Sequence, residues 1–360
     1  MTAVLAVASL GAGAQEAPLD TRVLDAASAA NTAGVVTWLE QGADANASQA
    51  DGATALHWAA HFDDASMADA LIRAGAAVDP ANDFGVTPLW LASLNGSAAM
   101  VETLLTAGAD ANLALPSGET VLMTAARTGS AEAVGLLVAH GANVNAREQS
   151  RGQTALMWAV AQQHPDVVAT LVELGADVHA RSNPLPRRIH TRTAGFNPAG
   201  VFDIVQGGYT PMLFAARQGN LDAAKHLVAG GADVNDAAPA GTTALVVAAH
   251  GGHTALATYL LEQGADPNAA EAGYTALHTA TLRGDETLVT ALLAAGADPN
   301  AVVVRGSPGR RNSPDYVLED DVVGATAFWL AAQFSEPGIM RVLADNGADQ
   351  RVVMPGGTTS

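Results

Sequence analysis

Histidine is the residue of this sequence whose spacing comes closest to a reactive or metal-binding pattern. His57 and His61 lie four residues apart, which places both imidazoles on one face of a helix at a spacing that can chelate zinc. His250 and His253 form a second close pair. Cysteine is absent, which excludes disulfides, thiolate nucleophiles and cysteine metal sites. We favour structural roles for both histidine pairs and predict no metal site and no cofactor.

Catalytic motifs are also missing from the sequence. It contains no H-E-x-x-H, no G-x-S-x-G and no G-x-x-x-x-G-K-[ST] pattern. Carboxylates are plentiful, but they recur at repeated turn positions, so nothing marks one pair as a general acid and base. The sequence therefore predicts a protein that is not an enzyme, with no catalytic residues.

The charge balance bears on the class of partner. The formal net charge is −19, from 36 acidic and 17 basic residues. A general nucleic-acid binder needs basic surface to neutralise phosphates, so we expect no nucleic-acid partner. The apolar run at residues 3–10 is too short to span a bilayer, no other stretch is long enough either, and we expect no membrane span.

The elements that position these side chains repeat along the chain. The phrase Thr54-Ala55-Leu56-His57-Trp58-Ala59-Ala60 recurs with its leading threonine at 87, 120, 154, 210, 243, 275 and 326. Successive threonines lie 33, 33, 34, 56, 33, 32 and 51 residues apart. Within each unit, the threonine caps a first helix, alanines keep that helix thin, and a second helix ends at a glycine suited to a left-handed residue. We predict a β-turn finger, a short helix, a tight turn and a second helix for every copy.

A period near 33 that opens like T-P-L-H-x-A and closes like G-A-D-x-N resembles the ankyrin repeat. The resemblance covers roughly residues 18–360, with about nine copies, and the pattern is similar to that of bacterial ankyrin-repeat proteins. It implies an all-α solenoid of helix-turn-helix units with β-turn fingers, here a single domain over 15–360. It also implies that His57 and His278, in the T-P-L-H position, hydrogen-bond within the scaffold.

Two insertions break the period, at the two longest intervals between threonines. They fall near 182–206 and 302–322, both after a G-A-D ending, so both are expected to extend fingers. The first insertion carries Arg187 and Arg188, while the second begins basic and ends acidic. These segments either contact a partner or lie back on the acidic scaffold, and the sequence leaves both interpretations open.

In the ankyrin family, partners bind the concave face, through finger tips and through residues that follow the paired alanines of the first helix. Arg127, Arg217 and Arg283 follow those pairs and could form an interrupted positive stripe, or could be separate surface arginines balanced by aspartates. Arginine and aromatic residues are enriched among such positions, as they are among interface hot spots. The predicted partner-binding residues are His61, Phe62, Phe84, Asn95, Arg127, Arg151, Gln162, Arg187, Arg188, Tyr209, Arg217, Gln218, Tyr274, Arg283 and Phe334.

The two ends carry separate predictions. Residues 1–14 combine a short apolar run with a small-x-small site, which favours a signal peptide and a periplasmic or secreted protein; the alternative is a cytoplasmic protein with an apolar tail. Residues 357–360 repeat the start of a unit, so we predict a tenth repeat beginning there and a longer parent protein.

The function predicted from these observations is non-enzymatic. We expect a monomeric interaction module that binds a protein or peptide through its concave groove and finger loops. One alternative is an adaptor or regulatory region of a larger enzyme or redox protein whose catalytic domain lies beyond the C-terminus. Another is a structural scaffold of the periplasm.

Overall fold

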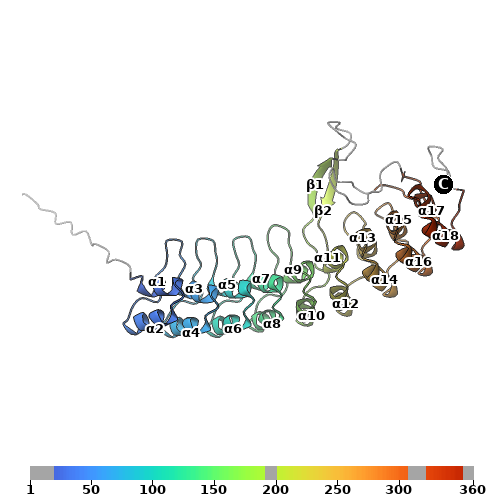
Figure 1. Ribbon diagram of the computed structural model, residues 1–360. Coiled ribbons are helices and arrows are strands. Elements are labelled where there is room, and N and C mark those ends of the chain that lie inside the picture. Colours follow the sequence, from blue (N-terminus) through green and yellow to red (C-terminus); the bar gives the residue numbers. More distant parts are fainter. Residues whose placement is uncertain (1–19, 191–200, 307–321, 352–360) are drawn as a thin grey trace, which may run out of the picture.

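A computed structural model describes residues 20–190, 201–306 and 322–351 of the chain. The predicted signal peptide, the start of a tenth repeat and most of the second insertion lie outside these ranges. Within them the chain forms a row of paired antiparallel helices, each pair stacked on the next (Figure 1). We call the first helix of each pair the inner helix, the second the outer helix, and the loop before each inner helix a finger. The helix-turn-helix solenoid predicted from the sequence is confirmed.

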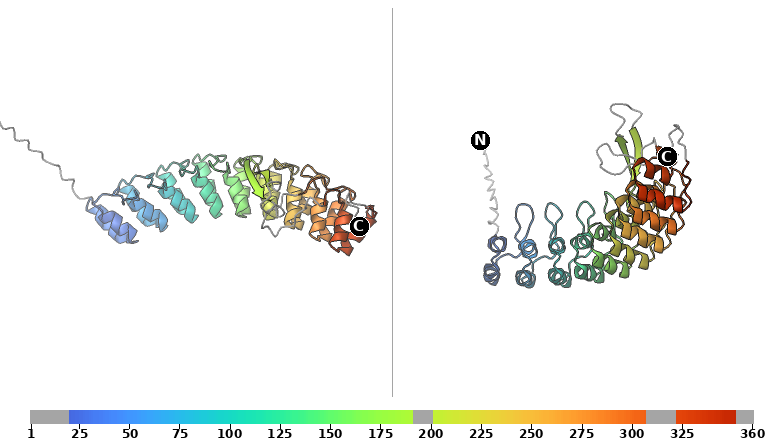
Figure 2. Two further views of the ribbon diagram at one scale, coloured as in Figure 1. Left: turned by 90° about the horizontal axis from the view of Figure 1, so that it is seen from above. Right: turned by 45° about the vertical axis from the view of Figure 1, so that its right-hand side comes forward.

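The inner helices are short, with the bounds α1 Arg22–Ser28, α3 Ala55–His61, α5 Pro88–Asn95, α7 Val121–Thr128, α9 Ala155–Ala161, α11 Pro211–Gln218, α13 Ala244–Gly251, α15 Ala276–Leu282 and α17 Ala327–Gln333. The outer helices are α2 Thr32–Glu40, α4 Ala65–Arg73, α6 Ala98–Thr106, α8 Ala131–Ala139, α10 Pro165–Glu173, α12 Leu221–Ala229, α14 Thr254–Glu262, α16 Glu286–Ala294 and α18 Pro337–Asp345. The row curves toward the fingers, so that the fingers and inner helices line its concave side (Figure 2). None of the helices in the described ranges is long and apolar enough to cross a membrane.

The repeated threonine starts each inner helix as the sequence predicts. The hydroxyl of Thr87, for example, accepts a hydrogen bond from the backbone N–H of Trp90 at 3.2 Å, which satisfies one of the free donors of the first turn. Pro88 occupies the first helical position, where its missing N–H costs nothing. The leucine, methionine and valine residues of each pair are largely buried between repeats, so stability comes from contacts between neighbours.

Polar side chains also join successive repeats. Asn112 donates from Nδ2 to the carbonyl of Gly141 at 2.9 Å and accepts from the N–H of Asn143 at 2.9 Å. The asparagine of the G-A-D-x-N ending makes the same pair of bonds at 46, 145, 235, 268 and 300. The asparagine that ends one repeat is therefore hydrogen-bonded to the end of the next repeat.

Backbone pairing locates both insertions within fingers. In a regular finger, the N–H of Leu115 bonds the carbonyl of Glu119 at 2.9 Å, just before the capping threonine. The matching bond joins Ser182 to Tyr209 at 3.0 Å around the first insertion, and Val303 to Ala325 at 2.9 Å around the second. Tyr209 and Ala325 also stand just before their capping threonines. The bases of both fingers are therefore kept while their tips are extended.

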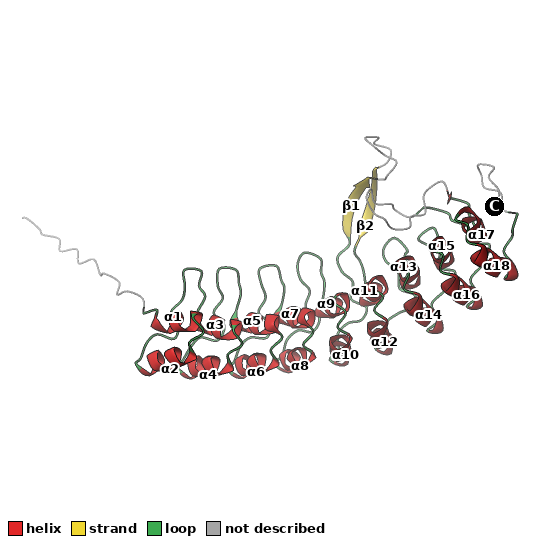
Figure 3. Cartoon of the chain, in the orientation of Figure 1, coloured by secondary structure: helices red, strands yellow, loops and turns green. Residues whose placement is uncertain are grey.

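The first insertion folds into an antiparallel hairpin that the sequence did not predict in this detail. Strand β1, Leu185–His190, pairs with β2, Val201–Gln206. The hairpin rises from the finger side of the solenoid between α10 and α11 and stands out among the helices and loops in Figure 3. It is the one part of the described chain that is built on strands rather than helices.

Candidate protein-binding surface

The structure distributes the predicted contact residues along the inner helices and fingers, on one side of the array. Phe62, Phe84 and Phe334 expose 42%, 70% and 48% of their surfaces, which is unusual for phenylalanine. The other exposed members of the predicted set are His61, Asn95, Arg151, Gln162, Arg187, Arg188 and Arg217. Arg127, Tyr209, Gln218 and Arg283 are half-buried.

An aromatic cluster covers the end of α3. The rings of Trp58 and Phe62 stack with their centroids 5.7 Å apart and 25° between planes, and His61 meets Trp58 edge-on at 5.7 Å. Trp58 is half-buried and packs against the core. The cluster presents an aromatic surface, with Phe62 exposed.

Arg127, on α7, is tied into its own scaffold. Its guanidinium bonds the carboxylate of Glu119 at 3.3 Å and lies over the ring of Trp158, 5.5 Å from the centroid. The hydroxyl of Thr124 donates to the same Glu119 oxygen at 2.9 Å. The charge of Arg127 is therefore balanced by a mostly buried carboxylate and is held against the next repeat.

Arg217 occupies the same position on α11, seven residues after the capping threonine, but its surroundings differ. Its guanidinium lies 5.1 Å from the ring centroid of Phe214 and 5.8 Å from that of Tyr209. Those two rings meet edge to face at 5.9 Å. In the described part of the chain the guanidinium makes no ion pair, and the side chain is exposed. Arg217 thus presents an unneutralised charge on an aromatic platform.

Two predicted contact residues turn out to hold the scaffold. Arg283 lies one position beyond Arg127 and Arg217 in its repeat, at the C-cap of α15, where it donates to the carbonyl of His250 at 2.9 Å. Asn95, at the same position in an earlier repeat, donates to the carbonyls of Ala60 and His61 at 2.9 and 3.0 Å. The side chain at the position eight residues after the threonine thus bonds the end of the preceding inner helix in both repeats, and Arg283 does not share the position of Arg127 and Arg217.

Tyr274 is also corrected by the structure. Predicted as an exposed finger-tip residue, it is only 7% exposed and packs in the core. Burial raises the pKa of its phenol above the ordinary value, so the side chain stays neutral. A buried neutral phenol is a scaffold residue and offers no contact surface.

The hairpin places further cations on the finger side. Arg187 and Arg188 are exposed on β1, and Arg187 donates to the side-chain carbonyl of Gln206 at 2.9 Å. At the hairpin base, the N–H of Tyr209 donates to the hydroxyl of Ser182 at 3.0 Å. Because the Tyr209 ring also lies under Arg217, the hairpin base and the Arg217 platform are continuous. We call Arg187, Arg188, Tyr209, Phe214 and Arg217 the hairpin corner.

Comparison with known proteins identifies the array. A family model described as ankyrin repeats matches three times, over residues 24–114, 100–182 and 212–302, which together cover more than half of the sequence. The chain belongs to the ankyrin repeat family. Among solved structures it is similar to the crystal structure of the human ASB11 ankyrin repeat domain, with 27% identity over 68% of this chain and 98% of that chain and a TM-score of 0.53. The comparison with curated proteins gave no match.

The family matches stop at residue 182 and resume at 212, so they leave out the hairpin. Ordinary ankyrin geometry explains the stack on either side of it but not the hairpin itself. The strands of the hairpin therefore lie outside the matched repeats, whereas Phe214 and Arg217 lie within them.

Arg181 joins the base of the hairpin to the following finger, a role that the sequence analysis did not predict. Its guanidinium donates to the carbonyls of Gly208 and Ala237 at 2.9 and 3.0 Å and forms an ion pair with Asp236. The neighbouring His179 stands where other ankyrin repeats of this chain carry the linking asparagine. That substitution was the available sequence signal that another side chain must join these two repeats.

The histidines of the T-P-L-H position act as scaffold residues. The N–H of Thr54 donates to Nδ1 of His57 at 3.0 Å, which leaves Nε2 to donate to the carbonyl of Val86 in the next finger at 3.0 Å. His278 bonds Thr275 and Ala301 in the same way. Burial lowers the pKa of both imidazoles, to about 4 for His278. Across the described ranges, no group of three or more histidine, aspartate or glutamate side chains could hold a metal ion.

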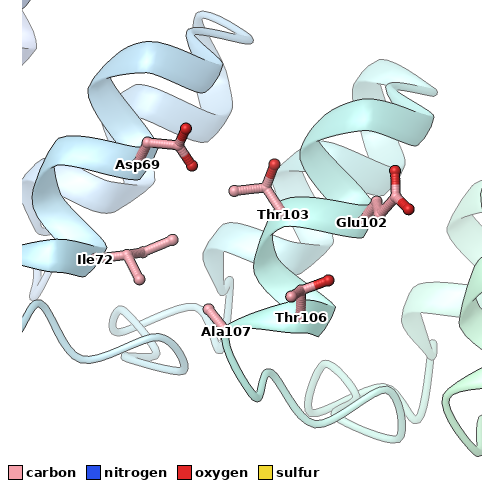
Figure 4. Close-up of a pocket in the computed structure, with 6 residues that line it drawn as sticks. All are labelled: Asp69, Ile72, Glu102, Thr103, Thr106 and Ala107. Atoms are coloured by element: carbon pink, nitrogen blue, oxygen red, sulfur yellow. The ribbon is translucent and has the colours of Figure 1, made fainter.

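A recess on the other side of the array differs from a ligand pocket. It lies between the outer helices α4 and α6 (Figure 4) and opens broadly to solvent. Its lining contains two carboxylates, Asp69 and Glu102, together with an isoleucine, an alanine and two threonines. Small-molecule sites are usually enclosed and largely apolar, so this recess gives no basis for a substrate.

Proposed function

We propose that this ankyrin array is a non-enzymatic module that binds a protein or peptide partner through its concave side, with the hairpin corner as the main contact. The observation that carries the proposal is Arg217, an exposed arginine supported by two aromatic rings and without an ion pair in the described chain. Arginine and aromatic residues in well-packed positions contribute most of the binding free energy in typical interfaces. The exposed Phe62 and Phe84 extend this surface toward the N-terminal repeats.

Electrostatics favours the same corner. In a protein of net charge −19, an unneutralised arginine marks a place where a partner carboxylate is attracted rather than repelled. We further propose that the protein is a monomer of nine repeats from a bacterium and that it is exported. The export proposal rests on residues 1–14 alone, which lie outside the described ranges.

The test compares Arg217→Glu with Arg341→Glu, a matched charge reversal at an exposed position of the outer helix α18. Immobilised protein is incubated with a periplasmic extract of the source organism, and the captured proteins are quantified by mass spectrometry. A partner retained by the wild type and Arg341→Glu but lost from Arg217→Glu supports the proposal. Equal capture by all three proteins, or loss from Arg341→Glu, would move the contact away from this corner.

A further inference from the structure

Aromatic residues recur at one position of the inner helices, four residues after the capping threonine. They are Trp58 on α3, Trp158 on α9 and Phe214 on α11. An arginine of this chain lies over two of these rings. Arg127 is 5.5 Å from the ring centroid of Trp158, and Arg217 is 5.1 Å from that of Phe214. Both distances are within the roughly 6 Å at which a cation is attracted to an aromatic face.

Trp58 lacks such an arginine. In the part of the chain that the structure describes, no arginine or lysine lies over its ring or over that of Phe62. The residue equivalent to Arg127, in the repeat before Trp58, is Ser28. The residue equivalent to Arg217 is His61, which meets the Trp58 ring edge-on, with 87° between planes, and does not cover its face. We call Trp58 and Phe62 the α3 surface.

The charges around the α3 surface favour a cation. Between Arg22 and Arg127 the only lysine or arginine is Arg73, which lies on the outer helix α4 and donates to a backbone carbonyl of that helix at 3.2 Å. Asp63 follows Phe62 directly, is exposed, and forms no ion pair with any described residue. A cation brought to this surface therefore meets a negative charge and no arginine or lysine on the neighbouring inner helices.

We infer that the α3 surface binds an arginine side chain of the partner protein, whose guanidinium stacks on the exposed rings beside Asp63. Phe62 is 42% exposed and therefore accessible to such a group. The inference rests on the proposed function and names the chemistry of a second contact, on an inner helix closer to the N-terminus than the hairpin corner (Figure 1).

The chemistry of the rings favours arginine over lysine. A guanidinium is planar, stacks on aromatic faces and is more weakly hydrated than an ammonium, so it loses less on leaving water. Arginine is also the residue that this chain places on its own rings, at Trp38, Trp158 and Phe214. An arginine from outside would complete at α3 the contact that α9 and α11 already have.

The probe is a capped hexapeptide of alternating arginine and glycine, with alternating lysine and glycine as its counterpart of equal charge. The lysine peptide measures the general attraction of the acidic chain for cations. Binding is followed by NMR through the indole N–H signals of the full chain, which contains five tryptophans. Trp58→Leu identifies the Trp58 signal, and leucine is suitable because Leu91 occupies the same position in α5.

Two substitutions to glutamine form a matched pair. Phe62→Gln removes the exposed ring, and the C-cap position it occupies already holds glutamine in α9, at Gln162. Phe334→Gln is the control, because Phe334 is the C-cap of α17 and is 48% exposed. Phe334 makes no ring contact with a described residue.

A third variant fills the site from within the chain. Ser28→Arg places a guanidinium before Trp58 as Arg127 stands before Trp158. This variant keeps both rings of the α3 surface and covers them. It is expected to shift the Trp58 signal without any peptide.

The arginine peptide is expected to shift the Trp58 signal and to bind the wild type and Phe334→Gln alike. It should bind Phe62→Gln about fivefold more weakly, since one aromatic contact is lost, and Ser28→Arg at least as weakly. The lysine peptide is expected to bind the wild type several-fold more weakly than the arginine peptide.

Three results would overturn the inference. They are equal affinity of the arginine peptide for the wild type and Phe62→Gln, an equal loss with Phe334→Gln, and a lysine peptide that binds as tightly as the arginine peptide. A shifted Trp58 signal in Ser28→Arg with undiminished peptide affinity would overturn it as well.

Other outcomes are separated by the same proteins. If the peptide-free wild type sediments as a dimer and Phe62→Gln as a monomer, the α3 surface belongs to a second copy of this chain and the inference is wrong. Failure of the inference is also distinguishable from failure of the proposed function. A partner lost from Arg217→Glu but retained by Phe62→Gln would leave the interaction module intact and remove only the arginine contact.

Discussion

Arg127 and Arg217 occupy equivalent positions in two repeats, yet they have different roles. In both, the backbone carbonyl accepts a hydrogen bond from a histidine of the next repeat, His164 at 3.0 Å and His253 at 3.3 Å. The contacts of the two side chains differ because of the finger residue just before the capping threonine. In the repeat of Arg127 this residue is Glu119, which supplies a carboxylate, and in the repeat of Arg217 it is Tyr209, which supplies a ring. One arginine therefore stabilises the scaffold, and the other remains available to a partner.

The position of each arginine within its repeat thus determines its backbone hydrogen bond, and the residue of the neighbouring finger determines whether its charge is paired. A binding surface in this family cannot be assigned from the inner helix alone, because the finger residue decides whether a charge is already paired. Substitutions and changes of pH or salt can separate scaffold effects from binding effects, beginning with the largest.

The largest expected effect is on the scaffold and depends on pH. The folded-state pKa of His278 is lowered by burial to about 4 from its ordinary value of 6.5, so the unfolded chain takes up a proton first as the pH falls. Stability from this group is present above pH 6.5 and is lost between 6.5 and 4, by about 3 kcal/mol in total. His57, with its lowered pKa, acts in the same direction. Urea unfolding at a series of pH values measures this loss.

The matched control is His278→Met, because Met123 and Met157 occupy the equivalent place in other repeats. This variant is expected to have a flatter pH profile than the wild type. Parallel profiles would show that His278 is not the titrating group. Partner binding through Arg217 should survive to about pH 5.5, since the guanidinium stays charged throughout.

The second effect is on binding. Arg217→Glu is expected to weaken the affinity for a captured partner about 30-fold, the size of a hot-spot residue, and to leave the thermal unfolding temperature unchanged. Isothermal titration and a thermal melt measure the two quantities. A fall in unfolding temperature that accounts for the lost affinity would make Arg217 a scaffold residue like Arg127.

The third effect is on stability rather than on binding. Arg127→Ala is expected to lower the free energy of unfolding by about 1 kcal/mol, because it removes a partly exposed ion pair and the contact with Trp158. Glu119→Gln should cost a similar amount, and the double variant less than the sum of the two. Arg217→Ala should cost less than Arg127→Ala. Additive single effects would indicate that Arg127 and Glu119 do not interact.

The smallest effect concerns salt. Raising the ionic strength from about 0.05 to 0.15 M is expected to weaken partner binding a few-fold, because exposed charges are screened. The stability difference between Arg127→Ala and the wild type should change less, since Glu119 is mostly buried. A salt-independent affinity would argue for a partner held by the aromatic residues instead.

Much of the fold follows from the sequence, because each repeat carries its own helix start and end signals. The capping threonines, the closing glycines and the places of both insertions could be derived from the period alone. The hairpin could not, since an insertion has no repeat to compare with.

The burial and contacts of the predicted site residues followed from the sequence only in part, for physical reasons that are specific to individual residues. Exposed Phe62, Phe84 and Arg217 were identified by type and position. Arg283 stands one residue further along its repeat than Arg127 and Arg217, and from that position its side chain bonds the end of the preceding inner helix. Tyr274 was misassigned because a finger position can point inward as easily as outward.

Hydrogen exchange of the full chain, with and without a captured partner, is the decisive measurement for the hairpin corner. We predict slower exchange in residues 182–190 and 201–218 when the partner is bound, and unchanged exchange in the outer helices α4 and α6. Protection confined to the outer helices, with the hairpin corner unaffected, would contradict the proposed binding surface.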